Sequence, residues 1–487
     1  MQYLMASGPW FRSAIDLSQK IDSDECSATE VCELFINRIK ERNKVTNAYV
    51  QISKPYARRA ARAADCFDVD NSSRSPLCGV PIAIKDNLNV AGVPTTFGAT
   101  AMINNVPKKS DVAVERLIKA GTVILGKTNM PEFGHRSTTD NPPFGPTSTP
   151  FDPSRTAGGS SGGSAAALAD GLATVALGTD GGGSLRIPAS ACGVYGHKPS
   201  AGLVPTRNRP DGFGYAPFVE TGPITRTVAD AAAVLNSISG YHPDDPFSYP
   251  TRGVNLRNAV ERPVDDLRVG WSPTLGLFPV TQSVRKTVDD AVELLRDVGV
   301  SVEHITPNFN RSRQEIREAW QCGFEVRLAC IHNSIRIEKG IDLLEEDDVT
   351  ELFCTLVERG QEYGAVEFKR ADAVRTSVFD TVQSLLKEYD LLITPTVSVP
   401  PFDVQTLGPQ QVGGEEIDPV FGWCLTWLFN MTGHPAASVP AGFVDGLPVG
   451  MQIVGPRFRD DLILAVAAAM EREQPWIETY PGISSLT

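Results

Sequence analysis

The sequence predicts an α/β fold, in which helices alternate with the strands of one large sheet. Residues 110–120 predict a helix and 122–125 the strand after it; 266–270 predict a strand, 284–298 a helix and 300–305 a further strand. A helix between two strands returns the chain to the same end of the sheet, so this alternation favours largely parallel strands. At 487 residues with 41% hydrophobic content, the chain can bury a large core as one unit or as two domains.

The N-terminal part follows the same pattern. Ser27 and Glu30 form a capping box before an amphipathic stretch, which predicts a helix that ends near Asn43. Residues 47–52 then predict a strand, and residues 54–65, rich in alanine and arginine, predict a surface helix.

Residues 77–84 form a short apolar run that ends at Lys85. A single lysine is usually a solvated surface group. Here it follows Ile82, Ala83 and Ile84, which should be buried, and burial lowers the pKa of a lysine. Lys85 is therefore a candidate base.

The centre of the chain, residues 155–199, contains two glycine–serine clusters, 158–164 and 181–184. A helix-like run (165–171) and a strand-like run (173–178) separate them. Glycine-rich loops bring backbone amides and serine hydroxyls close together, which predicts a site built from hydroxyls and N–H groups, with Ser160 and Ser184 as its candidate residues.

Three other interpretations of this stretch are less consistent with it. A P-loop needs a lysine where Ser164 stands. Residues 158–162 match the G-x-S-x-G pattern of a nucleophile elbow, but an elbow follows a strand directly and residues 150–153 indicate a turn. A disordered linker is the third alternative, and the apolar runs on both sides oppose it.

These motifs resemble those of the amidase signature family. Its features appear here as a series of segments: GVPIAIKD (79–86), GKTNMPEFG (126–134), NPPFGPTSTPFDPSRT (141–156), GGSSGGSAAALA (158–169), GTDGGGSLRIPAS (178–190), CGVYGHKP (192–199), GPITRTVAD (222–230), LLITPT (391–396) and NMTGHPAASVPAG (430–442). The resemblance covers most of the chain from about residue 25 to 475, with an interruption near 240–390. It implies one large mixed, mostly parallel sheet with helices on both faces. It also implies a single domain, 1–487, with a more variable helical cap at about 306–390.

The resemblance also assigns the chemistry. It implies that Ser184 is the nucleophile and that Ser160, in a cis peptide after Gly159, passes the proton to Lys85. A serine hydroxyl needs such a base. The amides that precede the nucleophile can point at one spot and would stabilise an oxyanion. These amides belong to Gly181, Gly182 and Gly183.

Two further sets of residues lie close to these motifs. Asp180 and Arg186 flank the nucleophile loop and are expected to form an ion pair that holds it, with an ordinary surface pair as the alternative. The resemblance places Phe133, Gly134 and His135 beside the acyl pocket, with His135 as a substrate contact. A Ser–His–Asp hydrolase would need a histidine beside the nucleophile, which the lysine relay makes unnecessary.

Substrate choice is less sharply predicted. The glutamyl-tRNA amidotransferase A subunits of the family typically carry R-Q-P-A after the nucleophile, whereas this chain has RIPA at 186–189, which favours a stand-alone hydrolase. An aromatic or extended neutral amide, or a carbamate, fits better than a charged one. Large aromatic side chains that could form the pocket, with core packing as the alternative role, are Trp320, Trp423, Trp427, Phe213 and Tyr215.

Residues 203–218 contain three prolines and two glycines, which exclude regular structure and predict a loop. Arg209 and Phe213 on this loop are expected to contact substrate as parts of a lid. An ordinary surface loop is the alternative.

Composition excludes several function classes. The net charge of −13 opposes nucleic acid or an anionic membrane as the partner. The resemblance implies that the partner is a small-molecule amide or carbamate, bound by a monomer or homodimer. No apolar run is long enough to span a bilayer, and no signal peptide is evident. Nine scattered cysteines fit reduced thiols and a cytoplasmic location. No cofactor or metal is expected. The alternatives that remain are an amidotransferase subunit and an inactive binding protein on the same fold.

Overall fold

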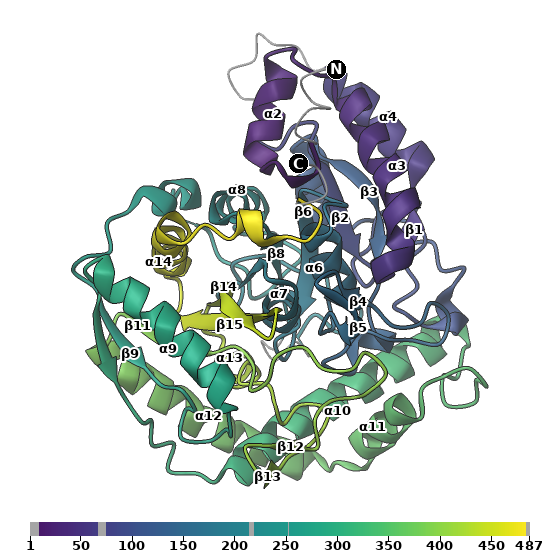
Figure 1. The fold of residues 1–487 in the computed structure, drawn as a ribbon. Helices are drawn as coiled ribbons and strands as arrows, with labels where there is room; N and C mark the ends of the chain where they lie inside the picture. Colours follow the sequence, from purple (N-terminus) through teal and green to yellow (C-terminus); the bar gives the residue numbers. More distant parts are fainter. Residues whose placement is uncertain (1–8, 67–74, 214–218, 252, 484–487) are drawn as a thin grey trace.

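The computed structural model describes residues 9–66, 75–213, 219–251 and 253–483. At its centre lies an 11-stranded sheet (Figure 1). In spatial order its strands are β1 (Tyr49–Ile52), β3 (Val123–Thr128), β2 (Pro81–Lys85), β6 (Val175–Asp180), β8 (Glu220–Thr225), β7 (Tyr195–Lys198), β14 (Ala436–Val444), β15 (Leu447–Val454), β11 (Leu391–Pro395), β9 (Arg268–Trp271) and β10 (Ser301–His304). Two small hairpins stand apart: β4 (Ser148–Thr149) with β5 (Asp152–Thr156), and β12 (Gln411–Val412) with β13 (Glu415–Glu416).

The sheet is large and mixed, as predicted. Parallel pairing occurs in two groups, β3–β2–β6 and β11–β9–β10. The strands between these groups pair antiparallel, and of these pairs only β14 and β15 are joined by a short turn. The mostly parallel character that the sequence predicts therefore holds at two places in the sheet and not in its middle.

Helices cover both faces of the sheet. The α-helices are α2 (Ala14–Asp22), α3 (Ala28–Thr46), α4 (Lys54–Asp65), α5 (Val112–Lys119), α6 (Gly162–Ala169), α7 (Arg186–Cys192), α8 (Val228–Ile238), α9 (Gln282–Asp297), α10 (Arg313–Lys339), α11 (Glu351–Glu362), α12 (Ala365–Glu388), α13 (Leu428–Thr432) and α14 (Asp460–Glu473). Short 3₁₀ turns are η1 (Pro9–Phe11), η2 (Thr100–Met102), η3 (Glu132–Gly134), η4 (Leu256–Glu261) and η5 (Ile477–Thr479). One series of contacting helices is α4, α3, α6 and α7; another is α5, α8, α14 and α9.

The predicted N-terminal elements are confirmed. The Ser27 side chain accepts from the amide of Glu30 and the Glu30 carboxylate accepts from the amide of Ser27, so α3 begins at the predicted capping box. The helix ends at Asn47, whose φ of 52° lies in the left-handed region that asparagine tolerates. The last helical residue, Thr46, lies three residues beyond the predicted end.

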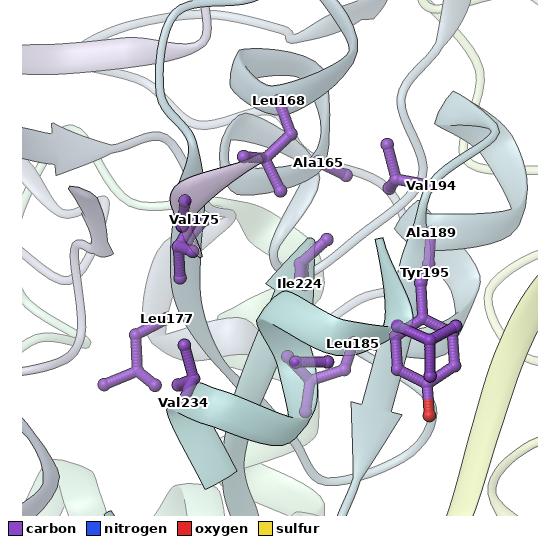
Figure 2. Packing of buried hydrophobic residues seen from close by; sticks show 14 of the residues in the cluster. Ala165, Leu168, Val175, Leu177, Leu185, Ala189, Val194, Tyr195, Ile224 and Val234 are labelled. Atoms are coloured by element: carbon purple, nitrogen blue, oxygen red, sulfur yellow. The ribbon is translucent and has the colours of Figure 1, made fainter. Parts of the chain in front are cut away.

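The buried side chains form two hydrophobic clusters. The first surrounds the parallel strands and the helices beside them; Figure 2 shows Leu168 of α6, Leu177 of β6 and Ile224 of β8 packed together with their neighbours. The second contains side chains of α10, α11 and residues 420–431. Along β11, Ile393 belongs to the first cluster and Leu392 to the second, because successive side chains of a strand point to opposite faces.

Residues 306–390 are largely helical, as predicted, and consist mainly of α10, α11 and α12, which lie along the lower side of the molecule in Figure 1. That this region is a variable cap within a single domain stays a prediction. Within the described ranges, no helix combines the length and the apolar composition needed to cross a membrane.

Candidate active site

The site is centred where β2 and β6 end. These two strands are parallel neighbours, paired at Ile84 and Leu177, so the residues that end them meet at one edge of the sheet. Lys85 is the last residue of β2, and Thr179 is the penultimate residue of β6. The parallel register of β2 and β6 thus places the Lys85 amine beside the Thr179 hydroxyl.

The Lys85 amine is fully buried and held by hydroxyl groups. Its Nζ donates to Ser160 Oγ at 2.7 Å and to Thr179 Oγ1 at 3.0 Å. Burial lowers the pKa of Lys85 to about 7; the Asp180 carboxylate opposes this lowering, and the Arg327 guanidinium adds to it. A substantial fraction of Lys85 is therefore unprotonated, and able to accept a proton, near neutral pH.

Ser160 lies in a loop of glycines before α6, and the peptide between Gly159 and Ser160 is cis, as the resemblance implies. Gly159 packs directly on the backbone of Thr138, and an added Cβ would lie 2.6 Å from the Thr138 carbonyl carbon. Of the stretch 150–153, expected to be a turn, Pro150 and Phe151 form a turn, and Asp152 and Pro153 begin β5. This strand pairs antiparallel with β4, and the two form a hairpin around a tight turn.

Ser184 lies in the loop between β6 and α7, and Ser161 ties this loop to the one before α6. The Ser161 amide donates to the Ser184 carbonyl at 3.2 Å, and the Ser161 hydroxyl donates to the Thr179 carbonyl at 3.2 Å. Ser184 and Ser160 consequently line the same cavity. Sequence reasoning missed Ser161, although it lies inside the first glycine–serine cluster.

The predicted oxyanion donors divide into two groups. The amides of Gly181 and Gly182 make no hydrogen bond within the described part of the chain, and both residues line the cavity. The amide of Gly183 donates to Asp180 Oδ1 at 2.7 Å. The inclusion of Gly183 among the donors is thus wrong, because its single N–H is already used by a carboxylate.

Asp180 and Arg186 form a fully buried ion pair, not a surface one. Arg186 Nε and Nη2 donate to the two carboxylate oxygens of Asp180 at 2.9 and 2.8 Å. Burial disfavours the charged carboxylate, but Arg186 more than offsets this and holds the pKa of Asp180 below its usual range. Arg186 also donates to Gln452 Oε1 and Asn430 Oδ1, so this pair anchors the nucleophile loop to β15 and α13.

The cavity at this site has a volume of about 30 Å³. The lining of the cavity combines serines, glycines and Thr179 with aromatic and basic side chains. The residues that line it are Asn87, Phe133, Gly134, Arg136, Ser137, Ser160, Thr179, Gly181, Gly182, Ser184, Val219, Phe324, Arg327 and Phe421.

Of the predicted substrate contacts, Phe133 and Gly134 lie in the cavity wall. Phe133 is held there with a φ of 48° by ring contacts with Phe97 and Phe353. His135 does not reach the cavity. Its ring is buried behind the wall with Nδ1 2.7 Å from the Glu132 carbonyl, and burial lowers its pKa to about 3, so it remains uncharged.

Arg209 and Phe213 also lie away from the cavity wall. Arg209 donates to the Asp244 carbonyl at 2.9 Å, and Phe213 is 83% exposed, with its ring against Phe247. The described residues 203–213 contain no regular helix or strand, as predicted. Tyr215, and the rest of the proposed lid at 214–218, lies outside the described residues.

Aromatic side chains of α10 and of the chain before α13 cluster beside the cavity, and two of them, Phe324 and Phe421, line it. Trp320 stacks on Phe324 at a centroid distance of 5.0 Å and meets Phe421 at 4.6 Å. Trp427 packs behind them against Trp320, whereas Trp423 packs against Phe402 away from this cavity. Phe324 and Phe421 were not predicted, because nothing in their local sequence distinguishes a cavity wall from a core.

The remaining unpredicted cavity residues are the apolar Val219 and five polar or basic residues: Asn87, Arg136, Ser137, Thr179 and Arg327. Asn87 and Thr179 could have been found, since both lie within two residues of a predicted site residue at a strand end. Among the described residues, no group of three or more His, Cys, Asp or Glu side chains is arranged to hold a metal ion.

Comparisons with known proteins agree with this geometry. A family model described as Amidase matches residues 30–464. An acylamidase of Rhodococcus erythropolis is 36% identical over 475 residues, covering 97% of each chain. The A subunit of the glutamyl-tRNA(Gln) amidotransferase from Carboxydothermus hydrogenoformans is 34% identical over 502 residues, covering 97% of this chain and 99% of the relative.

Solved structures give the same result. The structure of a bacterial aryl acylamidase of the amidase signature enzymes superposes with a TM-score of 0.93 at 36% identity, covering 97% of this chain and 98% of that one. The structure of 6-aminohexanoate cyclic dimer hydrolase in complex with substrate superposes with a TM-score of 0.88 at 30% identity, covering 98% of this chain and 99% of that one. The chain therefore belongs to the amidase signature family of hydrolases.

Proposed function

We propose that this amidohydrolase cleaves the C–N bond of aromatic or extended amides, and of carbamates, through an acyl-enzyme on Ser184. The observation that carries the proposal is the 2.7 Å hydrogen bond between the buried Lys85 amine and Ser160, in a cavity that Ser184 also lines. An amine, a hydroxyl and a second hydroxyl in one cavity can pass a proton along a line without a histidine.

In the first half of the reaction, neutral Lys85 takes the proton of Ser160 as Ser160 takes that of Ser184. The Ser184 oxygen then attacks the amide carbonyl carbon, and the carbonyl oxygen becomes an oxyanion. The unengaged amides of Gly181 and Gly182 donate to that oxyanion, a contribution that is often the largest in acyl transfer. When the tetrahedral intermediate collapses, the C–N bond breaks and the proton held at Lys85 returns through Ser160 to the leaving nitrogen.

In the second half, water replaces the amine. Lys85, again neutral, draws a proton from water through Ser160, the hydroxide attacks the ester carbon, and the same two amides hold the second oxyanion. Collapse of this intermediate returns the proton to Ser184 and releases the acid.

The aromatic side of the cavity supports the substrate class. Phe133, Phe324 and Phe421 line the same cavity as Ser160 and Ser184. Aromatic rings in offset or edge contact add about 0.5–1.5 kcal/mol each beyond the area that they bury. One relative is named an acylamidase, and one similar structure is that of an aryl acylamidase; the second name fits an aryl group against these rings.

The test is a substrate panel with a covalent label. The purified chain should turn over nitroanilides and aryl carbamates, and a fluorophosphonate should label Ser184 in the wild type and not in Ser184→Ala. Ser164→Ala, which removes a buried hydroxyl of α6 outside the cavity, should keep the label. Labelling that persists in Ser184→Ala and maps to Ser160 would overturn the assignment of the nucleophile.

An amidotransferase subunit is the second candidate, favoured by the 34% identity to an amidotransferase A subunit. The RIPA sequence at 186–189 departs from the R-Q-P-A typical of those subunits. Glutaminase activity that appears only with partner subunits, together with no turnover of anilides by the chain alone, would support this second candidate over the first.

A further inference from the structure

The proposed oxyanion donors lie in a run of three consecutive glycines. Gly181, Gly182 and Gly183 connect the end of β6 to Ser184. Because glycine has no Cβ, steric contacts of its own side chain do not restrict the φ and ψ angles of this run. The directions of the two donor amides, those of Gly181 and Gly182, therefore depend on contacts that hold the peptide groups of the loop.

The peptide group that contains the Gly181 amide is held through its carbonyl. This carbonyl belongs to Asp180 and accepts from Asn430 Nδ2 at 3.0 Å. Arg186 Nη2 donates to Asn430 Oδ1 at 2.8 Å, which sets the orientation of the Asn430 amide. Because a peptide group is planar, holding its carbonyl also fixes the direction of the Gly181 N–H.

The peptide group between Gly182 and Gly183 is held at both ends. Thr426 Oγ1 donates to the Gly182 carbonyl at 2.6 Å, and the Gly183 amide donates to Asp180 Oδ1 at 2.7 Å. Gly183 has a φ of 122°, and a Cβ added to it would lie 2.6 Å from Thr426 Cβ, so the Thr426 side chain also packs closely on the loop. The Gly182 amide lies between two peptide groups that are held, which limits its freedom to turn.

Thr426 is itself fixed, and it lies behind the loop. The residue is fully buried and does not line the cavity. Its carbonyl accepts from Arg186 Nη1 at 2.9 Å and from the Phe429 amide at 3.2 Å. Thr426 can therefore influence the reaction only through the loop that its hydroxyl holds.

Resting on the proposed acyl-enzyme mechanism, we propose that Thr426 is a positioning residue whose hydroxyl directs the Gly182 amide at the oxyanion. A donor that is already oriented needs no reorganisation as negative charge develops on the carbonyl oxygen of the substrate. The hydrogen bond from Thr426 should therefore stabilise the transition state more than the bound substrate. Its loss should lower kcat and leave KM nearly unchanged.

The experiment compares variants that keep or lose this hydroxyl. Thr426→Val puts a methyl in place of the hydroxyl and should lower kcat on a nitroanilide about tenfold to 10²-fold. Thr426→Ser keeps the donor and should retain most of kcat. Thr174→Val is the matched control, because the buried Thr174 hydroxyl donates to the Pro81 carbonyl at 2.7 Å at the opposite end of β6; this variant should keep wild-type kinetics.

A pair of inhibitors separates positioning of the oxyanion donor from a general loss of structure. When a trifluoromethyl ketone binds, the Ser184 oxygen bonds to its carbonyl carbon, its carbonyl oxygen becomes an oxyanion, and the serine proton passes through Ser160 to Lys85. The corresponding trifluoromethyl carbinol has the same body and forms no oxyanion. In Thr426→Val, the Ki of the ketone should rise by about the factor by which kcat falls, and the Ki of the carbinol should stay at its wild-type value.

Wild-type kcat and ketone Ki in a folded Thr426→Val would overturn the role of Thr426 and leave the acyl-enzyme mechanism intact. Equal rises in the Ki of the ketone and of the carbinol, or equal losses of kcat in Thr426→Ser and Thr426→Val, would reduce Thr426 to a structural residue and also overturn it.

If Thr426→Val does not fold, Thr426→Ser and Thr426→Ala give the same comparison, because both lose the methyl group and only serine keeps the hydroxyl. Failure of the wild type on every anilide, together with no ketone adduct at Ser184, would instead contradict the proposed function itself.

Discussion

Lys85 and Asp180 are both fully buried near the cavity, but the pKa shift favours the neutral form of Lys85 and the charged form of Asp180. Asp180 keeps its charge because Arg186 supplies two hydrogen bonds to its carboxylate. Among the described residues, Lys85 has hydroxyl and carbonyl oxygens as its hydrogen-bond partners, and these compensate a full positive charge less than a carboxylate would. The difference supports the roles proposed for them, Asp180 as a fixed support of the loop and Lys85 as the base.

The pH dependence of activity follows from Lys85. Because the base must be unprotonated and its pKa is about 7, kcat/KM should fall about tenfold per pH unit below pH 7 and level off above pH 8. Lys85→Arg keeps a charge that cannot be lost near neutrality, and should lower kcat about 10²- to 10⁴-fold. Initial rates on a nitroanilide between about pH 5.5 and 9 measure both effects.

Lys286→Arg on the exposed face of α9 is the control and should leave the profile unchanged. A flat profile across pH 7 in the wild type, or near-normal rates in Lys85→Arg, would contradict the proton relay.

At the scale of elements, the nucleophile loop and α10 meet with no space between them. A Cβ added to Gly182 would lie 2.9 Å from Trp320 Cζ2, closer than real contacts allow. Trp320 is packed between Phe324 and Phe421, so it can yield only by moving two rings of the cavity wall.

Gly182→Ala should therefore lower kcat/KM about tenfold or more, since a shift of about 1 Å in a site costs up to 10²-fold. Trp320→Phe removes the atom in conflict, so the double variant should recover part of the loss. Steady-state kinetics of the two single variants and the double variant measure this coupling. If the effects simply add, the contact does not limit the position of the loop.

Elements with a local signal were predictable from the sequence. The capping box marked the start of α3, and the apolar run 77–84 ended at a lysine that is indeed buried. The antiparallel middle of the sheet was not predictable from the helix–strand alternation, because strand order depends on contacts between distant segments. For the same reason Phe324 and Arg327 could not be predicted as cavity residues. Helix periodicity shows that they share one face of the helix, but it does not show which part of the protein that face contacts.

The sequence also could not predict which backbone amides are already engaged in hydrogen bonds. From the sequence, Gly181, Gly182 and Gly183 are equivalent candidate oxyanion donors. Only the structure shows that the Asp180 side chain turns back to take the Gly183 amide. Likewise, His135 follows two residues of the cavity wall, yet its ring points behind that wall, because its Nδ1 is held at the Glu132 carbonyl.

At the scale of the whole molecule, the two hydrophobic clusters share one sheet. In β14 and β15 as in β11, neighbouring residues supply different clusters: Ala437 and Ile453 belong to the first, and Ala436 and Val454 to the second. If either cluster lost its packing, one face of β11, β14 and β15 would be exposed, and the other cluster packs on the opposite face of the same strands.

The chain should accordingly unfold as a single domain in one cooperative transition. Thermal unfolding followed by far-UV circular dichroism and by tryptophan fluorescence should give the same midpoint, although Trp320 and Trp427 report on the second cluster and Trp271 on the first. Trp271→Phe makes fluorescence report more on the second cluster and should leave the agreement in place. Two separated transitions would show that the 306–390 region folds as its own unit.

The origin of the cavity walls along the chain has an evolutionary consequence. Lys85, Ser160 and Ser184 come from the first two-fifths of the sequence, whereas Phe324, Arg327 and Phe421 come from the last two-fifths. Substitutions that accumulate between residues 313 and 427 can remodel this part of the cavity lining while the three residues of the proposed proton relay are inherited unchanged. Drift or recombination in that segment alone can therefore give related enzymes new substrate ranges without passing through an inactive ancestor.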